Sequence, residues 1–529
     1  MTTTLLHDLP LHSAERSPAA RALTCGDRSM TYAELASDLR SLAGGLVERG
    51  LGRGERVAIY LEKRFEFVIA AFGAPAAGAV FVPVNPLLKP DQVAYILRDC
   101  NVRVLVTSAE RFPLLKEHLL QCHDLRRVVL TGNGAADGDG LPFAVDRWQE
   151  VLAGAGAAPH RVVDTDMAAI LYTSGSTGRP KGVVLSHRNM VAGAKSVASY
   201  LDNRPDDTLL AALPLSFDAG FSQLTTAFHA GARVVLLNYL LPKDVLNALA
   251  GERVTGLTAV PPLYIQLTQL KWPESIADHL RYFANTGGRM PLETLKALRT
   301  ALPRSRPYLM YGLTEAFRST YLPPEQVDVR PDSIGKAIPN AEILVLREDG
   351  SECAANEPGE LVHRGALVGM GYWNDPEKTA ERYRPLPCRE AGLVLPEIAV
   401  FSGDTVRRDE EGYLYFIGRR DEMIKTSGYR VSPTEIEEVL YGTQLVGEAA
   451  AFGVPHPQLG QAVVVVVTAR DGILDTDTLL RRAREQLPAY MVPARIEVRP
   501  GPLPRNPNGK IDRKLLASEF QDMYAGSAP

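Results

Sequence analysis

Hydrophobic residues in the first 130 positions alternate between helical and strand-like spacing. Residues 31–50 predict a helix, because Leu35, Leu39, Leu42 and Leu46 recur at helical intervals before Gly50. A second helix is predicted at 65–77. Short apolar runs predict strands at residues 57–60, 80–84, 102–107 and 127–131. Strands separated by helices favour parallel α/β layers.

The end of the chain has its own alternation of helix and strand. Residues 431–440 predict a helix with Ser432 or Thr434 as its cap, because acidic residues occupy its first turn. The β-branched run at 462–468 is too short for a membrane span and predicts a buried strand.

Composition changes twice along the chain. Residues 132–140 (GNGAADGDG) predict an exposed loop, and the hairpin strand predicted at 412–419 precedes a change after Arg420. We therefore expect an α/β (α+β) fold of two domains. Residues 1–420 form a large domain of layered α/β subdomains, and residues 421–529 form a small mobile α+β domain.

Overall charge and composition exclude several classes of protein. The 529 residues are 45% hydrophobic and 23% charged, with a net charge of −4, so neither a disordered chain nor a polyanion-binding one is expected. No apolar run approaches the ~18–20 residues of a membrane helix, and no basic segment followed by a long apolar core begins the chain. The sequence predicts a soluble, cytoplasmic enzyme that binds neither nucleic acid nor a membrane.

The cysteines argue against a disulfide framework or a thiolate zinc site. They are odd in number, scattered and never spaced as C-x-x-C. The five are Cys25, Cys100, Cys122, Cys353 and Cys388.

A glycine- and hydroxyl-rich loop is the first candidate for chemistry. Residues 171–182 read LYTSGSTGRPKG, between strands predicted at 168–171 and 183–185. Glycines let the backbone approach a ligand, hydroxyls donate hydrogen bonds, and Lys181 adds a positive charge, which together suit a polyphosphate. The loop matches neither the Walker A nor the G-x-G-x-x-G pattern, and a mobile linker is the alternative.

Three further segments carry side chains suited to a nucleotide. In YGLTE (311–315), tyrosine can stack on a base, threonine can donate to a phosphate and glutamate can hold Mg²⁺, although an ordinary turn has the same composition. Asp404 and Arg419 can contact a ribose, or belong to a solvated charged hairpin. Lys510 follows an Asn-Gly turn from which a loop can enter a cleft, although lone loop lysines are usually solvated.

In this order and over this length, the segments resemble the adenylate-forming (ANL) superfamily of acyl-CoA synthetases, luciferases and peptide-synthetase adenylation domains. The resemblance covers nearly the whole chain. It extends to MTYAEL at 30–35, GEL at 359–361 with GYWN at 371–374, and GRRDEMIKTSG at 418–428.

The resemblance implies a role for each matching residue. It assigns the pyrophosphate loop to Thr173, Ser174, Gly175, Ser176, Thr177, Gly178 and Lys181. It implies that the nucleotide is bound by Tyr311 at the adenine, Thr314 at the α-phosphate, Asp404 and Arg419 at the ribose, and also by Gly312. Glu315 is implied to bind Mg²⁺. Asp421 falls at the hinge, and Lys510 bridges the substrate carboxylate and the α-phosphate. Lys510, Glu315 and Thr173 are the expected catalytic residues.

The implied reaction fits these residue types and requires ATP and Mg²⁺. Attack of a carboxylate on the α-phosphate of ATP gives an acyl-adenylate, from which AMP leaves readily. Two anions meet in this step, so a lysine and a magnesium ion are needed to neutralise the crowded charge. A thiol then takes the acyl group, and a lysine on a rotating domain can serve the first step and leave before the second.

Asp218 carries the information about the acid. An acid in the otherwise apolar segment 213–231 is costly unless it is paired. Amino-acid adenylation domains place an aspartate here for the substrate ammonium, after an aromatic gate at Phe217. The alternative is that Asp218 caps a helix beginning at Ala219.

Other positions are expected to line the acid pocket by the same resemblance. They are Gly220, Ser222, Thr286, Gly287, Gly288 and Met310. The small Gly220 predicts room for an extended alkyl chain rather than a short or dicarboxylic acid. Arg318 can pair with a second acid on the substrate or with Asp218, and we favour the structural interpretation.

The segments SFDAG and YGLTEAFRST look like the free-standing β-amino-acid adenylation enzymes of macrolactam polyketide biosynthesis. We therefore expect activation of a 3-amino acid and its transfer to the phosphopantetheine of a discrete acyl carrier protein, since no carrier domain follows Lys510. The same segments resemble AMP-forming ligases of exopolysaccharide-type gene clusters, so a carboxylate–CoA ligase is the alternative. A pseudo-enzyme is disfavoured by the intact Lys181, Glu315, Asp404 and Lys510.

Overall fold

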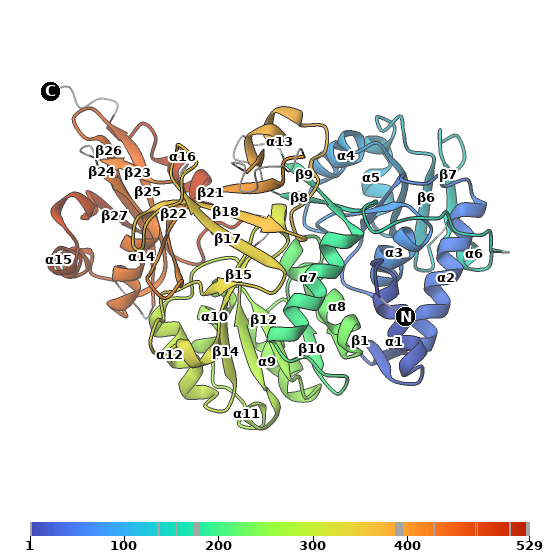
Figure 1. Ribbon diagram of the computed structural model, residues 1–529, viewed down its shortest axis with the longest axis horizontal. Coiled ribbons are helices and arrows are strands. Elements are labelled where there is room, and N and C mark those ends of the chain that lie inside the picture. The colour runs from blue at the N-terminus through green and yellow to red at the C-terminus, as the bar shows by residue number, and fades with distance from the viewer. Residues whose placement is uncertain are drawn as a thin grey trace.

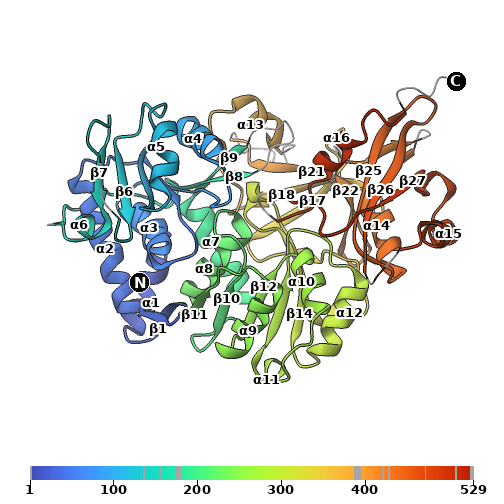
Figure 2. The same cartoon turned by 180° about the vertical axis from the view of Figure 1, so that it is seen from behind.

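The computed structural model describes residues 3–134, 138–154, 156–173, 180–386, 395–419, 422–426, 429–470, 472, 474–506 and 509–524. In these residues a large N-terminal domain and a smaller C-terminal domain lie at opposite ends of the molecule (Figures 1 and 2). The predicted boundary at 420/421 stays a prediction, because Arg420 and Asp421 lie outside the described residues.

An eight-stranded sheet contains all the strands predicted in the first 130 residues. Its order is β19 (Gly371–Tyr372), β9 (Lys181–Ser186), β8 (Met167–Thr173), β4 (Val80–Pro83), β3 (Arg56–Tyr60), β5 (Val102–Ser108), β6 (Arg127–Thr131) and β7 (Ala144–Arg147). Neighbours from β8 to β7 are parallel, which confirms the layered α/β prediction.

A nine-stranded sheet forms the second large layer. Its order is β16 (Lys336–Ala337), β15 (Thr320–Leu322), β14 (Arg306–Tyr311), β13 (Tyr282–Asn285), β12 (Gly256–Ala259), β10 (Thr208–Ala211), β11 (Arg233–Leu236), β1 (Arg21–Cys25) and β2 (Arg28–Thr31). Within the run from β14 to β1, each strand is parallel to the next, whereas β15 pairs antiparallel with β14 and β2 with β1.

Two smaller sheets complete the molecule. One contains β17 (Ala341–Leu346), β18 (Gly359–Gly365), β20 (Tyr383–Pro385), β21 (Ile398–Arg408) and β22 (Leu414–Arg419). The other, in the C-terminal domain, contains β23 (Ile424–Thr426), β24 (Tyr429–Val431), β25 (Val446–His456), β26 (Gly460–Ala469) and β27 (Arg495–Val498). The predicted buried strand at 462–468 is the centre of β26, whose valines are buried.

Helices cover the sheets and connect their strands. The N-terminal domain contains α1 (Asp8–Arg16), α2 (Tyr32–Glu48), α3 (Phe65–Ala76), α4 (Pro90–Asp99), α5 (Phe112–Leu119), α6 (Trp148–Leu152), α7 (His187–Tyr200), α8 (Asp218–Ala230), α9 (Pro242–Gly251), α10 (Pro261–Thr268), α11 (Ile276–His279), α12 (Leu292–Ala301) and α13 (Pro376–Arg382). The C-terminal domain contains α14 (Pro433–Gly442), α15 (Thr476–Gln486) and α16 (Arg513–Glu519). Within the described residues, no helix has the length and apolar character needed to cross a membrane.

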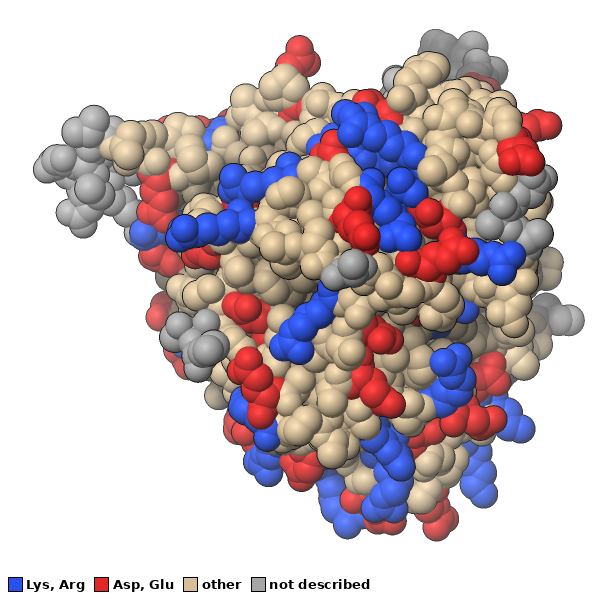
Figure 3. All heavy atoms as spheres, turned by 90° about the vertical axis from the view of Figure 1, so that its right-hand side faces the viewer, with Lys and Arg blue, Asp and Glu red and all other residues tan. Residues whose placement is uncertain are grey.

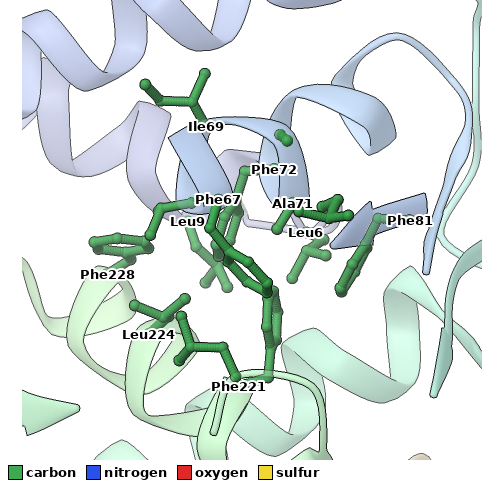
Figure 4. Packing of buried hydrophobic residues seen from close by; sticks show 14 of the residues in the cluster. Leu6, Leu9, Phe67, Ile69, Ala71, Phe72, Phe81, Phe221, Leu224 and Phe228 are labelled. Carbon is green, nitrogen blue, oxygen red and sulfur yellow. The ribbon is translucent and has the colours of Figure 1, made fainter. Parts of the chain in front are cut away.

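An aromatic core between the two large sheets fixes α8. Phe221 lies between Phe72 and Phe81, with ring centroids 5.5 and 4.7 Å away, and Leu224 and Phe228 extend the same face of the helix (Figure 4). Burial of such rings contributes about 1.5–3 kcal/mol each. One face of α8 is thereby anchored, and its opposite face is free to line a site.

The end of the molecule formed by β6, β7 and α6 carries both signs of charge side by side (Figure 3). Arg103 pairs with Glu55 at 3.1 Å and with Asp124, while Arg127 pairs with Asp146. Neighbouring charges of opposite sign largely cancel beyond a Debye length. This face therefore presents no single-sign field, in keeping with the small net charge.

Candidate active site

Loops at one edge of the nine-stranded sheet gather residues from distant segments. Because β12, β13 and β14 are parallel and in register, their carboxyl ends lie at the same edge. Residues 286–288 follow β13 there, and 312–315 follow Tyr311, the last residue of β14. The first residue of α8, Asp218, follows the adjacent strand β10. Such carboxyl edges are the usual place for ligands in parallel sheets.

Tyr311, Asp404 and Arg419 form one polar group. Asp404 and Arg419 lie opposite each other on β21 and β22, with 3.5 Å between Arg419 Nε and Asp404 Oδ1. The Tyr311 hydroxyl donates a hydrogen bond to Asp404 Oδ2. Burial raises the pKa of Asp404, and the Arg419 guanidinium opposes that rise. The predicted adenine and ribose residues are thus brought together.

The strands on either side of the glycine-rich segment pair antiparallel. Thr173, at the end of β8, lies opposite Lys181, at the start of β9, as the strand–loop–strand prediction requires. Lys181 Nζ lies 5.5 Å from the centroid of the Tyr372 ring. The residues predicted for the loop itself, Ser174, Gly175, Ser176, Thr177 and Gly178, lie outside the described residues.

Glu315 is held in a short 3-10 helix, η1 (Thr314–Ala316), by a neighbouring tyrosine. The Tyr372 hydroxyl donates to Glu315 Oε1 at 2.6 Å, and the Gly369 amide donates to its backbone carbonyl at 2.8 Å. The described residues contain no cluster of three metal-ligating side chains. Mg²⁺ bound with a nucleotide needs only one or two carboxylates in addition to phosphate oxygens, so Glu315 fits this requirement.

Lys510 reaches this edge from the C-terminal domain. A Cβ built on Gly287 would lie 3.4 Å from Lys510 Cε, and only a glycine leaves that space open at the φ of +76° found there. Desolvation lowers the pKa of Lys510, while the Asp218 carboxylate acts in the opposite direction. The predicted lysine therefore lies against Gly287, in the loop that follows β13.

Contacts near α14 hold the C-terminal domain against the N-terminal domain, with Lys510 beside Gly287. Glu438 accepts a hydrogen bond from the Leu292 amide at 3.2 Å, and its carboxylate lies 3.7 Å from Arg289. Gln444 donates to Glu293 at 2.8 Å. These contacts join α14 and Gln444, just after it, to the start of α12 and to Arg289, just before it, next to the loop that contains Gly287.

Asp218 is the first residue of α8 and forms a buried ion pair. Arg318 Nη1 lies 3.1 Å from Asp218 Oδ2, and the two residues are 2% and 8% exposed. The helix begins one residue earlier than the capping alternative requires, with Phe217 at the N-cap position. The structural interpretation of Arg318, as a partner of Asp218, matches this contact.

A strained turn places Arg318. Phe317 has φ +57° and ψ −41°, and the Arg318 amide donates to the Ala316 carbonyl at 2.6 Å, which defines a γ-turn of the rare positive-φ kind. The Phe317 ring is fully buried against Gly193 of α7, where a Cβ would lie 2.4 Å from the ring. Such strain persists only where the surrounding packing enforces it.

The free face of α8 lines a small cavity of about 20 Å³, which has room for about one water molecule. Two predicted pocket residues, Ser222 and Met310, lie in its wall together with Arg318 and Gln223. Thr286, Gly287 and Gly288 lie outside this wall, and Gly287 lies under Lys510. Phe217 is buried in the core shared with α9 and α10.

The expectation that Gly220 leaves room for an alkyl chain is wrong. A Cβ on Gly220 would lie 1.7 Å from the carbonyl oxygen of Pro214, so the missing side chain accommodates the preceding loop. Gly220 is not among the residues that line the cavity. The glycine is therefore required for the close approach of α8 to the Pro214 backbone.

Two contributors to the site were missed in the sequence. Tyr372 was noted only as part of GYWN, and its hydrogen bond to Glu315 requires β19 to pair with β9. Gln223 has no distinguishing neighbour in the chain. The helical spacing of Ala219, Ser222 and Thr226 is the signal that could have placed it on the cavity face.

Two sequence profiles match most of the chain. The profile of the AMP-binding enzyme matches residues 11–373, and that of the AMP-binding enzyme C-terminal domain matches residues 435–510. The second profile ends at Lys510. The two matches lie in the large and the small domain, respectively.

Individual relatives differ in the thiol that they use. An L-proline–[L-prolyl-carrier protein] ligase of Streptomyces coelicolor is 33% identical, over 94% of this chain and 93% of its own. A long-chain-fatty-acid–CoA ligase of Salmonella typhimurium is 30% identical, over 96% and 93%. The crystal structure of ATP-bound MatB from Rhodopseudomonas palustris, 26% identical, superposes with a TM-score of 0.86 over 99% of this chain and 100% of that one.

Proposed function

Because the chain belongs to the AMP-binding enzyme family, we propose that it activates a 3-amino (β-amino) carboxylic acid and passes the acyl group to the phosphopantetheine of a discrete acyl carrier protein. Membership makes the chain an AMP-forming acid–thiol ligase that adenylates a carboxylate and uses ATP and Mg²⁺. The amino group of the acid and the carrier protein are the proposed parts.

The reaction proceeds in two balanced steps. A carboxylate oxygen of the acid attacks the α-phosphorus of ATP, and the bond to the bridging oxygen breaks, so pyrophosphate leaves. The thiol sulfur then attacks the acyl carbon, loses its proton and releases AMP. Lys510 serves the first step, because its ammonium can lie between two anions that would otherwise repel each other.

The other residues of the site hold the nucleotide in this scheme. Asp404 and Arg419 bind the ribose, and Tyr311 packs on the base. Thr173 and Lys181 contact phosphate oxygens. Mg²⁺, when held by Glu315, supplies positive charge beside the phosphates.

One observation carries the choice of an amino acid. The carboxylate of Asp218 is buried at the start of α8, and it opposes the lowering of the Lys510 pKa by desolvation. A buried carboxylate is retained only where cations or donors satisfy it. Arg318 is one such partner, with its Nη1 3.1 Å from Asp218 Oδ2, and an ammonium group near the reacting carboxylate of the substrate supplies a second. The 33% identical prolyl-carrier protein ligase supports both an amino acid and a carrier protein.

The proposal is tested by ATP–pyrophosphate exchange with fatty, α-amino and β-amino acids of graded length. We expect 3-amino acids to drive exchange, and Asp218→Asn to reduce kcat/KM for them by about 10- to 100-fold, because one charge-assisted hydrogen bond is lost. Asp206→Asn, on an exposed loop, is the matched control. Exchange with plain fatty acids and not with amino acids would exclude an amino-acid substrate.

A carboxylate–CoA ligase is the second candidate, favoured by the 30% identical fatty-acid–CoA ligase. Free CoA and a phosphopantetheinylated carrier protein are to be compared as acceptors at equal concentration. We expect the carrier protein to be acylated at the higher kcat/KM. Efficient acyl-CoA formation, with little acylation of the carrier, would establish the second candidate instead.

The contact between Tyr372 and Glu315 predicts an effect on magnesium. Tyr372→Phe removes the donor 2.6 Å from Glu315 Oε1, so we expect the apparent KM for Mg²⁺–ATP to rise about tenfold. Tyr383→Phe is the matched control, because that hydroxyl donates to the backbone carbonyl of Glu315, at 3.4 Å, rather than to its carboxylate. Equal KM values in the two variants would show that Tyr372 does not position Glu315.

A further inference from the structure

We propose that Asp99 and Tyr95 of α4 are positioning residues, which hold Thr173 and Lys181 where they contact the departing pyrophosphate of ATP. The inference rests on the proposed function, which assigns phosphate contacts to Thr173 and Lys181. It adds two residues of a helix that no motif of the site includes. Their side chains hydrogen-bond to the chain directly before each of these two phosphate-contacting residues.

The two contacts lie one helical turn apart on α4. The Tyr172 hydroxyl donates a hydrogen bond to the Asp99 carboxylate, and the Tyr95 hydroxyl donates to the Pro180 carbonyl at 3.4 Å. Tyr95 and Asp99 are four residues apart, so both side chains lie on one face of the helix. That face therefore braces the end of β8 and the start of β9 at the same time.

The pairing of β8 with β9 transmits these contacts to the phosphate-contacting residues. Thr173 lies opposite Lys181 in the antiparallel register, and Tyr172 lies opposite Gly182. The Tyr172 side chain is buried, and a Cβ on Gly182 would lie 3.1 Å from its ring. Since the ring is packed this closely on the paired strand, a shift of Tyr172 would move Thr173 and Lys181 together.

The backbone carbonyl of Asp99 holds a third segment of the site. Trp373 Nε1 donates to this carbonyl at 3.0 Å, and Asn374 Nδ2 donates to it at 2.6 Å. Trp373 directly follows Tyr372, whose ring centroid lies 5.5 Å from Lys181 Nζ. The end of α4 therefore also positions the aromatic ring against which the Lys181 ammonium lies.

The place of Asp99 is unfavourable for the helix itself. Asp99 is the last residue of α4, where the partial negative charge of the helix end disfavours a carboxylate. The residue is half-buried, and desolvation raises the pKa of its carboxyl, while the Tyr172 hydrogen bond opposes that rise. A carboxylate that works against its own helix is expected where its contact serves a site.

The test compares the binding of Mg²⁺–ATP and of AMP to the full-length protein by isothermal titration calorimetry. AMP lacks the two phosphates that leave as pyrophosphate. We expect Asp99→Ala to raise the Kd for ATP about tenfold and to leave the Kd for AMP within about twofold, because only the pyrophosphate contacts are displaced. Equal increases for the two nucleotides, or an unchanged Kd for ATP, would overturn the inference.

Further variants separate the hydrogen bond from a general loss of packing. Asp99→Asn keeps a carbonyl oxygen that can accept from Tyr172, so its Kd for ATP should lie within about threefold of wild type. Tyr172→Phe keeps the ring, removes the donor and should match Asp99→Ala, and it replaces that variant if Asp99→Ala fails to fold. The double variant should bind ATP no more weakly than either single one, whereas additive losses would contradict a shared contact.

The second contact and the control use the same helix. Tyr95→Phe is expected to raise the Kd for ATP by less, about threefold, because its hydrogen bond of 3.4 Å is long. An unchanged Kd would overturn the role of Tyr95. Asp91→Ala is the matched control, since it removes a carboxylate that is 88% exposed in the first turn of α4.

Lys181→Ala distinguishes failure of this inference from failure of the proposed function. Unchanged ATP binding in Lys181→Ala would overturn the assignment of phosphate contacts and this inference with it. Weaker ATP binding in Lys181→Ala, together with wild-type binding in Asp99→Ala, would overturn the inference alone. No acid is present in these titrations, so neither result depends on which acid the enzyme activates.

Discussion

Lys510→Ala is expected to reduce acid-dependent pyrophosphate exchange by about 10²–10³-fold or more, while thioester formation from a preformed acyl-adenylate stays within a few-fold of wild type. The reason is electrostatic. Only the first step brings two anions together, and the Lys510 side chain reaches Gly287, at the edge of the sheet where the site residues gather. The measurement follows both half-reactions, the second with synthetic adenylate and the thiol acceptor.

A surface lysine provides the comparison. Lys296→Ala removes an ammonium that is 71% exposed on α12, and it should change neither half-reaction, because exposed ion pairs contribute little. Equal losses in both half-reactions of Lys510→Ala would indicate damage to the fold of the C-terminal domain. Undiminished pyrophosphate exchange in Lys510→Ala would show that Lys510 is not needed for adenylate formation.

Gly220→Ala is expected to lower the midpoint of thermal unfolding by several degrees and to abolish most of the exchange activity. The new Cβ would lie 1.7 Å from the Pro214 carbonyl, which is backbone and cannot rotate away. Overpacking in a core costs about 1–3 kcal/mol or more, which exceeds the ~1 kcal/mol of helix propensity gained. Displacement of α8 would also move Asp218 away from Arg318.

The matched substitution is Gly251→Ala, in α9. A Cβ there meets nothing within 4 Å, so helix propensity alone acts and the unfolding midpoint should stay equal or rise. Both variants are measured by thermal unfolding and by exchange with the preferred acid. A midpoint for Gly220→Ala as high as that for Gly251→Ala would show that the Pro214 loop relaxes at little cost.

Local signals account for the part of the fold that the sequence predicted. The helix at 31–50 is α2, and it begins at a capping box in which Thr31 and Glu34 exchange hydrogen bonds. The predicted strand at 127–131 is β6. These elements depend on spacing, caps and β-branched residues within one segment, and such information is present in the chain.

Candidate residues of the site were also found in the sequence, but most of their contacts were not, and for Arg318 the sequence left pairing with Asp218 or with a second acid of the substrate open. Tyr311, Asp404 and Arg419 were chosen from separate motifs, and the structure joins them in one polar group. The contact between Asp218 and Arg318 spans 100 positions. No local pattern reports such a pairing, because it depends on where α8 and the loop after β14 meet.

Gly220 shows most clearly which properties follow from the sequence and which only from the tertiary structure. The sequence by itself determined the α/β layers, the second domain and the set of residues suited to ATP, an acid and Mg²⁺, because these follow from local periodicity and side-chain chemistry. Only the tertiary structure decided that Gly220 accommodates the Pro214 backbone, that Asp218 is paired with Arg318, and that Lys510 lies over Gly287. Those properties depend on distances between segments far apart in the chain, and close packing sets such distances.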